Sequence, residues 1–220
     1  MKSKILAVVL VLIVMAVIPI ITMQNGFYLF TNNSSDTKTA TENTTQAPTV
    51  NNNYDNQQVL QGLLYAKHSD DVTDEALKAM AVIFQTDLKA DKYCFDLEDK
   101  SIYCSEEELK SKYENSYKEI KERITSITES VKNIYIFSND EICYVPYAQC
   151  SSGCTFADEN YPGLLSVASP WDRLSKNYSN DNRCAGVSLD GIVFLTENKN
   201  DYKTALMWYL PNYEIRECKT

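Results

Sequence analysis

The chain of 220 residues is 44% hydrophobic and 23% charged, proportions typical of a globular protein, which excludes a fully disordered chain and a multi-span membrane protein. Its 21 Lys and Arg residues against 30 Asp and Glu residues give a formal net charge of -9 without a basic cluster, which argues against nucleic acid as a partner. His68 is the only histidine, so a metal site built mainly of histidine is nearly excluded.

The N-terminal segment predicts a membrane anchor. Ile5–Met23 is an uncharged run, and a helix of that length spans about 29 Å, close to the thickness of the bilayer core. Lys2 and Lys4 precede it, so the positive-inside rule leaves residues 1–4 as a cytoplasmic stub and places the rest outside the cell membrane. A cleavable signal peptide is the alternative, but its apolar region is usually shorter, and no small-x-small cleavage site follows the run.

Residues 24–58 are expected to form a disordered linker. Between Thr31 and Gln58 the only large apolar side chains are Val50 and Tyr54, which bury too little surface to offset the entropy of ordering the chain. From residue 59 the composition becomes that of a folded protein. We therefore expect a single-pass membrane protein with one extracytoplasmic domain over residues 59–220.

The first elements of this domain read as a helix and two short strands. Thr73 has the side chain of an N-cap, and Asp74–Leu88 is apolar on most sides, which indicates a buried helix. Tyr93–Leu97 and Ile102–Tyr103 are short strand candidates. Ser105 and Glu108 then form a capping box, which predicts the start of a helix. That helix is expected to be long and amphipathic, with an apolar stripe at helical spacing that comprises Leu109, Tyr113, Tyr117, Ile120, Ile124, Ile127 and Val131.

The remaining elements complete an α+β fold. Ile134–Phe137 and Ile142–Tyr147 flank a polar turn and predict a central antiparallel β-hairpin. Helical patterns return at Gly191–Glu197 and Tyr202–Leu210. Helices and strands in mixed order, with the strands clustered in the middle, are typical of the α+β class.

Several short motifs occur along the domain. Within Val59–Val82 lies EALKA, followed by AV. Further on are the turn SSGCT (Ser151–Thr155), the stretch Tyr161–Asp172 ending in SVASPWD, and GVSLDG (Gly186–Gly191). In this order they resemble the opening helix, the SGGxT turn, the YPYLxSVxSPxD stretch and the GxSQxG motif of the stage II sporulation protein D family. The resemblance covers Val59 to about Ile215, and an N-terminal single-span anchor fits that family too.

The resemblance implies a protein of the peptidoglycan cell wall in sporulating bacteria. Enzymes of that family are lytic transglycosylases that cut glycan strands beside a partner amidase, and related members are amidase enhancers. The reaction requires no cofactor but one carboxyl group, which protonates the glycosidic oxygen and then acts as a base. The resemblance also implies a groove that binds the glycan, formed by Ser151, Ser152, Gly153, Thr155, Asp172, Gly186 and Ser188.

The sequence departs from that family at the catalytic position. Aligned without gaps, the catalytic Glu falls on Lys67, and a lysine, with an ordinary pKa of about 10.4, offers no carboxylate. Four other positions of the expected groove also differ from the family: Met80, Gln85, Arg183 and Leu189. We therefore expect a catalytically degenerate, glycan-binding module that acts as a scaffold or enhancer. The alternatives are an active transglycosylase that uses Asp70 or Asp71, and a surface protein with an empty groove.

Seven cysteines complete the set of candidate site residues. Cys94 and Cys104 flank a short acidic loop. The resemblance places Cys150, Cys154 and Cys184 near one another, because Cys150 directly precedes the SSGCT turn, Cys154 lies in it, and Cys184 lies just before GVS. A disulfide, free thiols and a zinc site are all compatible with this trio, although only His68 could add a nitrogen ligand to zinc.

Overall fold

The computed structural model describes residues 55–90 and 95–218, which all lie in one compact unit. The predicted cytoplasmic stub (1–4), the predicted membrane span (5–23) and residues 24–54 of the predicted linker lie outside the described residues. Among the helices of the described part, none is long and apolar enough to cross a membrane.

The folded unit begins earlier than predicted. Helix α2 (Asn56–Lys67) takes in residues 56–58, which we expected to belong to the linker. Its start is set by Asp55, whose side chain accepts a hydrogen bond from the backbone N–H of Gln57 and so caps the helix. The inward face of α2 is apolar from Val59 onward, so the helix is stabilised mainly by its packing against α3.

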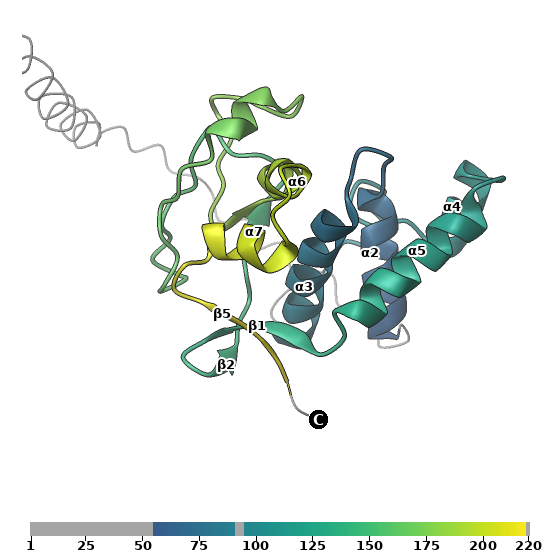
Figure 1. Cartoon of the computed structure of the whole chain (residues 1–220), viewed down its shortest axis with the longest axis horizontal. Helices are drawn as coiled ribbons and strands as arrows, with labels where there is room; N and C mark the ends of the chain where they lie inside the picture. The colour runs from purple at the N-terminus through teal and green to yellow at the C-terminus, as the bar shows by residue number, and fades with distance from the viewer. Residues whose placement is uncertain (1–54, 91–94, 219–220) are drawn as a thin grey trace, which may run out of the picture. The chain divides into compact units, whose positions relative to one another are not determined.

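Helix α3 (Asp74–Ala90) is the centre of the fold. It contacts α2, α5, α6, α7 and β1, and Figure 1 shows it beside α2 with α5 alongside both. The prediction of a buried helix is confirmed, because apolar side chains on most of its sides are excluded from solvent: Ala76, Leu77, Ala79, Met80, Ala81, Val82, Ile83 and Phe84. A helix in this position needs apolar side chains around most of its circumference, since most of its faces pack against other elements.

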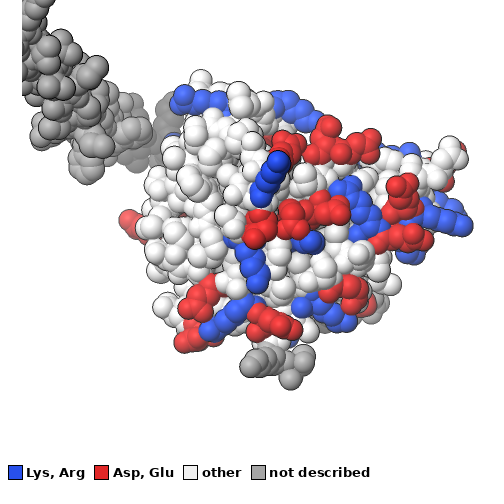
Figure 2. Space-filling model, viewed as in Figure 1, with Lys and Arg blue, Asp and Glu red and all other residues white. Residues whose placement is uncertain are grey.

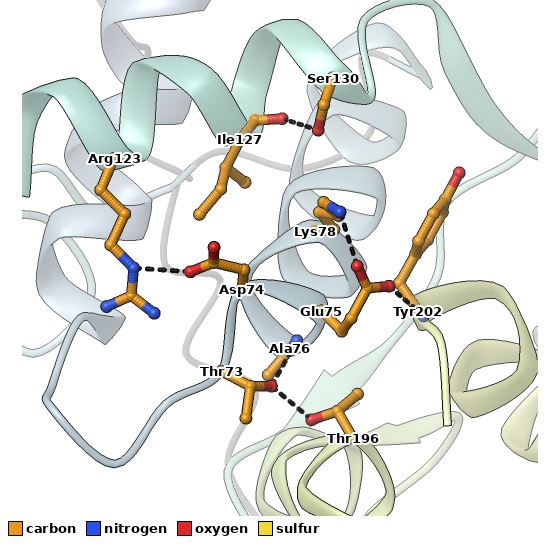
Figure 3. Close-up of polar contacts among 10 residues, drawn as sticks. All are labelled: Thr73, Asp74, Glu75, Ala76, Lys78, Arg123, Ile127, Ser130, Thr196 and Tyr202. Atoms are coloured by element: carbon orange, nitrogen blue, oxygen red, sulfur yellow. Dashed lines mark hydrogen bonds and ion pairs between the residues drawn. The ribbon is translucent and has the colours of Figure 1, made fainter. Parts of the chain in front are cut away.

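The first turn of α3 ties three other helices together (Figure 3). Thr73 accepts a hydrogen bond from the backbone N–H of Ala76, as expected of an N-cap, and its hydroxyl lies 2.8 Å from that of Thr196 at the end of α6. Glu75 accepts one hydrogen bond from Lys78 and another, 2.9 Å long, from the backbone N–H of Tyr202 in the first turn of α7. Asp74 pairs with Arg123 of α5 at 2.7 Å. The first turn of α3 is therefore bonded to α5, α6 and α7.

The predicted long amphipathic helix is two helices, α4 (Glu106–Lys112) and α5 (Tyr117–Ser130). The capping box is confirmed, since Ser105 and Glu108 exchange hydrogen bonds between side chain and backbone. The chain leaves helical geometry at Tyr113 and turns through residues 114–116, where Asn115 and Ser116 are weak helix formers. The apolar stripe survives this break, with Leu109, Ile120, Ile124, Ile127 and Val131 all buried.

The sheet is smaller than predicted and has a strand that we did not predict. Strand β1 (Ile134–Ser138) lies between β2 (Glu141–Ile142) and β5 (Glu214–Glu217), antiparallel to both. Asn139 and Asp140 form the hairpin turn and both have positive φ, as a two-residue turn requires. The prediction of a hairpin is therefore confirmed at the turn, but its second strand ends at Ile142 instead of Tyr147.

Beyond Ile142 the chain enters a second, parallel pair of strands. Strand β3 (Tyr147–Ala148) pairs with β4 (Val187–Ser188), which leads directly into α6 (Leu189–Glu197) and then α7 (Tyr202–Tyr209). Between β3 and β4 runs a long connection that contains the short helix η1 (Pro170–Leu174). With six helices and a small antiparallel sheet in the described residues, the unit is an α+β fold, as predicted.

The two short strand candidates before α4 were wrong. Residues 95–97 and 102–103 are not strands, and residues 93–94 lie outside the described residues. The backbone N–H groups of Ile102 and Tyr103 both donate to the carbonyl of Asp99, and that of Cys104 donates to the carbonyl of Gly62. Local turns and α2 therefore take up the hydrogen bonds that a strand would have needed.

Candidate functional site

Lys67, which the resemblance aligns with the family's catalytic Glu, ends helix α2 with its ammonium group in a polar cluster. Its Nζ donates to the carbonyl oxygen of Ser101 at 3.2 Å and to the side-chain oxygen of Gln149 at 3.3 Å. Burial lowers the pKa of Lys67, while the negative charges of Asp190 and Asp99 act in the opposite direction. The lysine side chain is thus half-buried and held by two acceptors near the surface.

Asp190 lies on the other side of Gln149. The amide nitrogen of Gln149 donates to Asp190 Oδ1 at 2.6 Å, and the backbone N–H of Asp190 donates to the carbonyl of Gln149 at 2.9 Å. Asn177 Nδ2 donates to Asp190 Oδ2 at 2.9 Å, and the hydroxyl of Ser175 bonds the same oxygen. The six residues of this polar cluster come from five parts of the chain: Lys67, Ser101, Gln149, Ser175, Asn177 and Asp190.

The motifs that suggested a groove do meet in space. The backbone N–H of Ser169 donates to the carbonyl of Gly153, and that of Thr155 donates to the carbonyl of Val167, so the SSGCT turn lies against the SVASPWD stretch. The backbone N–H of Phe156 donates to the carbonyl of Cys184, next to the GVS segment. Gln149 lies two residues before Ser151, the first residue of the SSGCT turn, so the turn adjoins the polar cluster.

Four of the seven predicted glycan-binding residues have buried side chains that bond within the fold: Ser151, Thr155, Asp172 and Ser188. Asp172 Oδ2 accepts from the backbone N–H of Ser151 at 2.9 Å, and Ser188 caps α6 by accepting from the N–H of Gly191. Asp172 Oδ1 is buried and has no hydrogen-bond partner within the described residues. Ser152 and Gly153 are partly exposed, so they are the members of this set that retain surface.

Gly186, the seventh predicted residue, has a conformational role. Its φ is +76°, and a Cβ there would lie 2.1 Å from the carbonyl oxygen of Pro146. The backbone N–H of the next residue, Val187, donates to that same carbonyl at 3.0 Å. Glycine is therefore required for β4 to approach β3 and for α6 to start where Asp190 reaches Gln149.

Asp70 and Asp71, the fallback carboxylates, lie elsewhere. Both are exposed in the loop between α2 and α3, and no hydrogen bond in the described part of the chain joins either of them to the polar cluster. Asp190 is the carboxylate that our sequence analysis missed. Asp190 belongs to the GVSLDG segment and directly follows Leu189, one of the positions that differ from the family.

Three of the four other changed positions do not face the polar cluster, contrary to expectation. The side-chain nitrogen of Gln85 donates to the backbone carbonyls of Val131 and Ile134, where α5 passes into β1. Leu189 is buried in the core with Met80, each at 2% exposure or less. Gln85, Leu189 and Met80 are thus explained by packing and by the hydrogen bonds of neighbouring backbone.

The three cysteines near the SSGCT turn are free thiols. Cys150 and Cys184 are buried, and burial raises their pKa values to about 11 and about 12, while Cys154 is exposed. A protonated thiol is a poor nucleophile and a poor metal ligand at neutral pH. Nowhere in residues 55–90 and 95–218 do three His, Cys, Asp or Glu side chains gather in a group that could hold a metal ion, so the zinc alternative gains no support.

His68 directly follows Lys67 but serves the loop into α3. Its Nδ1 lies 3.3 Å from Nη1 of Arg123, and Nη2 of the same guanidinium donates to the carbonyl oxygen of Val72. Because arginine can only donate, Nδ1 accepts the bond and the ring is neutral. Burial, and then the positive charge of Arg123, lower the pKa of His68.

Charge on the surface is mixed. On the face drawn in Figure 2, acidic and basic side chains are interspersed and no broad basic area is visible, as the net charge of -9 leads one to expect.

Sequence comparisons with known protein families and with curated proteins find no match for this chain.

Proposed function

We propose that this chain is a single-pass membrane protein of the bacterial cell wall, related to stage II sporulation protein D, that binds peptidoglycan glycan strands without cutting them. Its extracytoplasmic domain acts as a scaffold or enhancer for a separate wall hydrolase, such as an amidase. The proposal rests on the motif order along the domain. The observation that supports the absence of cleavage is the position of Lys67 and its hydrogen bonds.

A lysine in this position opposes transglycosylase chemistry for two reasons. The ammonium group of Lys67 donates hydrogen bonds to Ser101 and Gln149, so these two hydrogens are not directed at a leaving-group oxygen. It is also a cation, and a cation beside the sugar destabilises a transition state that itself carries oxocarbenium-like positive charge. Glycan binding has no such requirement, because hydroxyl and amide groups of a sugar can bond to any of the polar groups in the cluster.

Asp190 is the specific observation that favours a second candidate function, an active lytic transglycosylase with a relocated carboxylate. It lies in the same polar cluster as Lys67, joined to it through Gln149. Its two oxygens accept hydrogen bonds from three side chains, which occupy three of the about four lone-pair positions of a carboxylate and leave little room for a glycosidic oxygen. We therefore rank this function second.

Both candidates are tested by one experiment on the full chain in detergent. The protein is incubated with purified insoluble peptidoglycan, the pellet is assayed for bound protein, and the supernatant is analysed for anhydro-muropeptides. Binding without anhydro products supports the first function. Anhydro products that disappear in Asp190→Asn support the second, and a protein that remains in the supernatant without producing either signal contradicts both.

A further inference from the structure

Beyond the polar cluster, three aromatic rings from three separate segments pack against one another. Trp171 of η1 stacks on Phe194 of α6, with ring centroids 5.4 Å apart and an interplanar angle of 7°. Trp208 of α7 meets the same Trp171 ring at 5.2 Å and 57°. Trp208 is 45% exposed, although large aromatic side chains are mostly covered in a folded domain. We call these three residues the aromatic platform.

The two indole rings are held in place by hydrogen bonds inside the fold. Nε1 of Trp208 donates to the carbonyl of Ala168 at 2.9 Å, and Nε1 of Trp171 donates to the hydroxyl of the buried Tyr209 at 3.0 Å. A Cβ at residue 191 would lie 1.8 Å from the Tyr209 hydroxyl, so Gly191 is needed for α6 to approach this closely. With both N–H groups satisfied internally, Trp208 offers ring surface to solvent and no free donor.

The aromatic platform and the polar cluster are continuous. Asp190 and Phe194 are four residues apart in α6 and so lie on the same face of that helix. Trp171 belongs to η1, and Ser175, which follows η1 directly, bonds Asp190. Helix α6 contacts both η1 and α7, and Figure 1 shows α6 and α7 next to each other. An apolar ring surface therefore adjoins a set of amide, hydroxyl and carboxylate groups.

We propose that the aromatic platform is a pyranose-binding subsite, in which one sugar ring of a glycan strand packs its C–H face on Trp208. This inference rests on the proposed glycan binding and specifies where the strand lies. The C–H groups of a pyranose carry partial positive charge and are attracted to the negative face of an aromatic ring. The adjacent sugar of the strand then reaches Asn177 and Asp190, whose amide and carboxylate groups bond its hydroxyls.

The surroundings favour a neutral carbohydrate over other ligands. Neither Trp171, Phe194 nor Trp208 carries a charge, and the chain as a whole has a net charge of -9, which repels anionic lipids and nucleic acids. An apolar surface bordered by a few fixed polar groups is the usual composition of a site for an uncharged small ligand.

The experiment uses the fact that Trp171 and Trp208 are the only tryptophans, so fluorescence excited selectively at tryptophan, and not at the 15 tyrosines, reports on the aromatic platform. The full chain in detergent is titrated with chitotetraose, a soluble β-1,4-linked tetramer of N-acetylglucosamine, and affinities of the variants are measured by calorimetry. We expect a saturable change in emission for the wild type. Trp208→Ala should weaken binding about tenfold or more, and Trp208→Phe, which keeps an aromatic face, should stay within about threefold.

Two controls separate stacking from general apolar contact. Trp208→Leu keeps an apolar side chain without a ring, so we expect it to bind as weakly as Trp208→Ala. Phe156→Ala removes an exposed aromatic residue outside the platform and should leave the titration unchanged. Melting temperatures measured in parallel show whether each variant is folded. Wild-type affinity in folded Trp208→Leu or Trp208→Ala would overturn the proposal.

Pelleting with insoluble peptidoglycan distinguishes failure of this inference from failure of the proposed function. Suppose that the wild type and Trp208→Ala pellet equally well and that the wild type shows no response to chitotetraose. The glycan then binds elsewhere, so the subsite is refuted while the proposed function stands. If the wild type neither pellets nor responds to chitotetraose, both are overturned. If Trp208→Ala loses both the pelleting and the response, both are supported.

Discussion

Lys67 and Asp190 lie on opposite sides of one amide group, that of Gln149. The amide oxygen accepts from Lys67 Nζ at 3.3 Å, and the amide nitrogen donates to Asp190 Oδ1 at 2.6 Å. The amide therefore fits both charged neighbours at once, with its acceptor toward the cation and its donor toward the anion. A side chain with only donors in place of Gln149 would put a donor against the Lys67 ammonium group. A side chain with only acceptors would put an acceptor against the Asp190 carboxylate.

The same geometry makes Asp190 important for stability. In Asp190→Asn, the new amide nitrogen is a donor that faces the side-chain donors of Gln149, Ser175 or Asn177, so at least one hydrogen bond to a charged acceptor is lost. We expect a loss of about 1–3 kcal/mol in the free energy of unfolding, measured by denaturant titration. Asp70→Asn, an exposed carboxylate outside the cluster, is the matched control and should stay within about 0.5 kcal/mol. Equal stability of the two variants would show that the hydrogen bonds of Asp190 do not matter.

His68 should make the fold less stable in mild acid. Burial and Arg123 lower its pKa in the folded state below the ordinary 6.5, so between those two values the unfolded chain binds a proton that the folded one does not. Stability is then lost as the pH falls below about 6.5, because the protonated ring would face Arg123. Melting curves from pH 7.5 to pH 5 should show this loss in the wild type and a smaller one in His68→Gln. An identical pH dependence in both would refute the contribution of His68.

Asp87 should act in the opposite direction. It is fully buried in α3, its Oδ1 accepts from the backbone N–H of Val145 at 2.9 Å, and burial raises its pKa to about 8 from an ordinary 3.8. Between these values the folded state holds a proton that the unfolded state has released, so its contribution to stability is lost as the pH rises toward 8.

The test for Asp87 is the difference between variant and wild type at each pH. Asp87→Asn keeps the acceptor for Val145 and cannot ionise, so its stability relative to the wild type should increase steadily from pH 5 to pH 8. Because His68 changes in the same pH range, the comparison is repeated in a His68→Gln background, where the same trend is expected. A constant difference across the range would mean that Asp87 is ionised in the fold.

The elements of the fold that could be predicted from the sequence are those set by residues close together in the chain. The buried character of α3, the capping box at Ser105 and the hairpin turn at Asn139 were predicted correctly, because each depends on residues close together in the chain. The break at Tyr113 was missed, since the apolar stripe continues across it. Strand β5 was missed as well, because Glu214–Glu217 contains one apolar side chain, Ile215, and exists as a strand only through its pairing with β1.

The candidate site was harder to predict than the fold. Alignment to a motif identifies Lys67, but the partners of Lys67 are Ser101 and Gln149, which lie 34 and 82 residues further along the chain. The aromatic platform likewise joins residues that are distant in the chain, because the packing of η1 and α7 brings Trp171 and Trp208 together. Such neighbours depend on how the elements pack, and no local pattern in the sequence encodes them.

Placing a carboxyl group at residue 67, where the resemblance puts the catalytic Glu, should give little cleavage activity. Lys67→Glu would bring a second carboxylate next to Asp190 and remove the cation that balances it, without providing a groove shaped for cleavage. We expect at most trace amounts of anhydro-muropeptides from this variant. Adding Gln85→Arg and Leu189→Gln should lower stability instead of raising activity, because the first loses the bonds to Val131 and Ile134 and the second buries a polar group. Strong cleavage by the triple variant would contradict this.

The most direct test of the central claim is the analysis of products released from purified peptidoglycan by the wild-type full chain. Because Lys67 stands where the resemblance places the proton donor and is held by Ser101 and Gln149, we expect the protein to pellet with the peptidoglycan and to release no anhydro-muropeptides. Abundant anhydro-muropeptides from the unmodified protein, abolished by Asp190→Asn, would contradict the claim and identify the chain as an active transglycosylase.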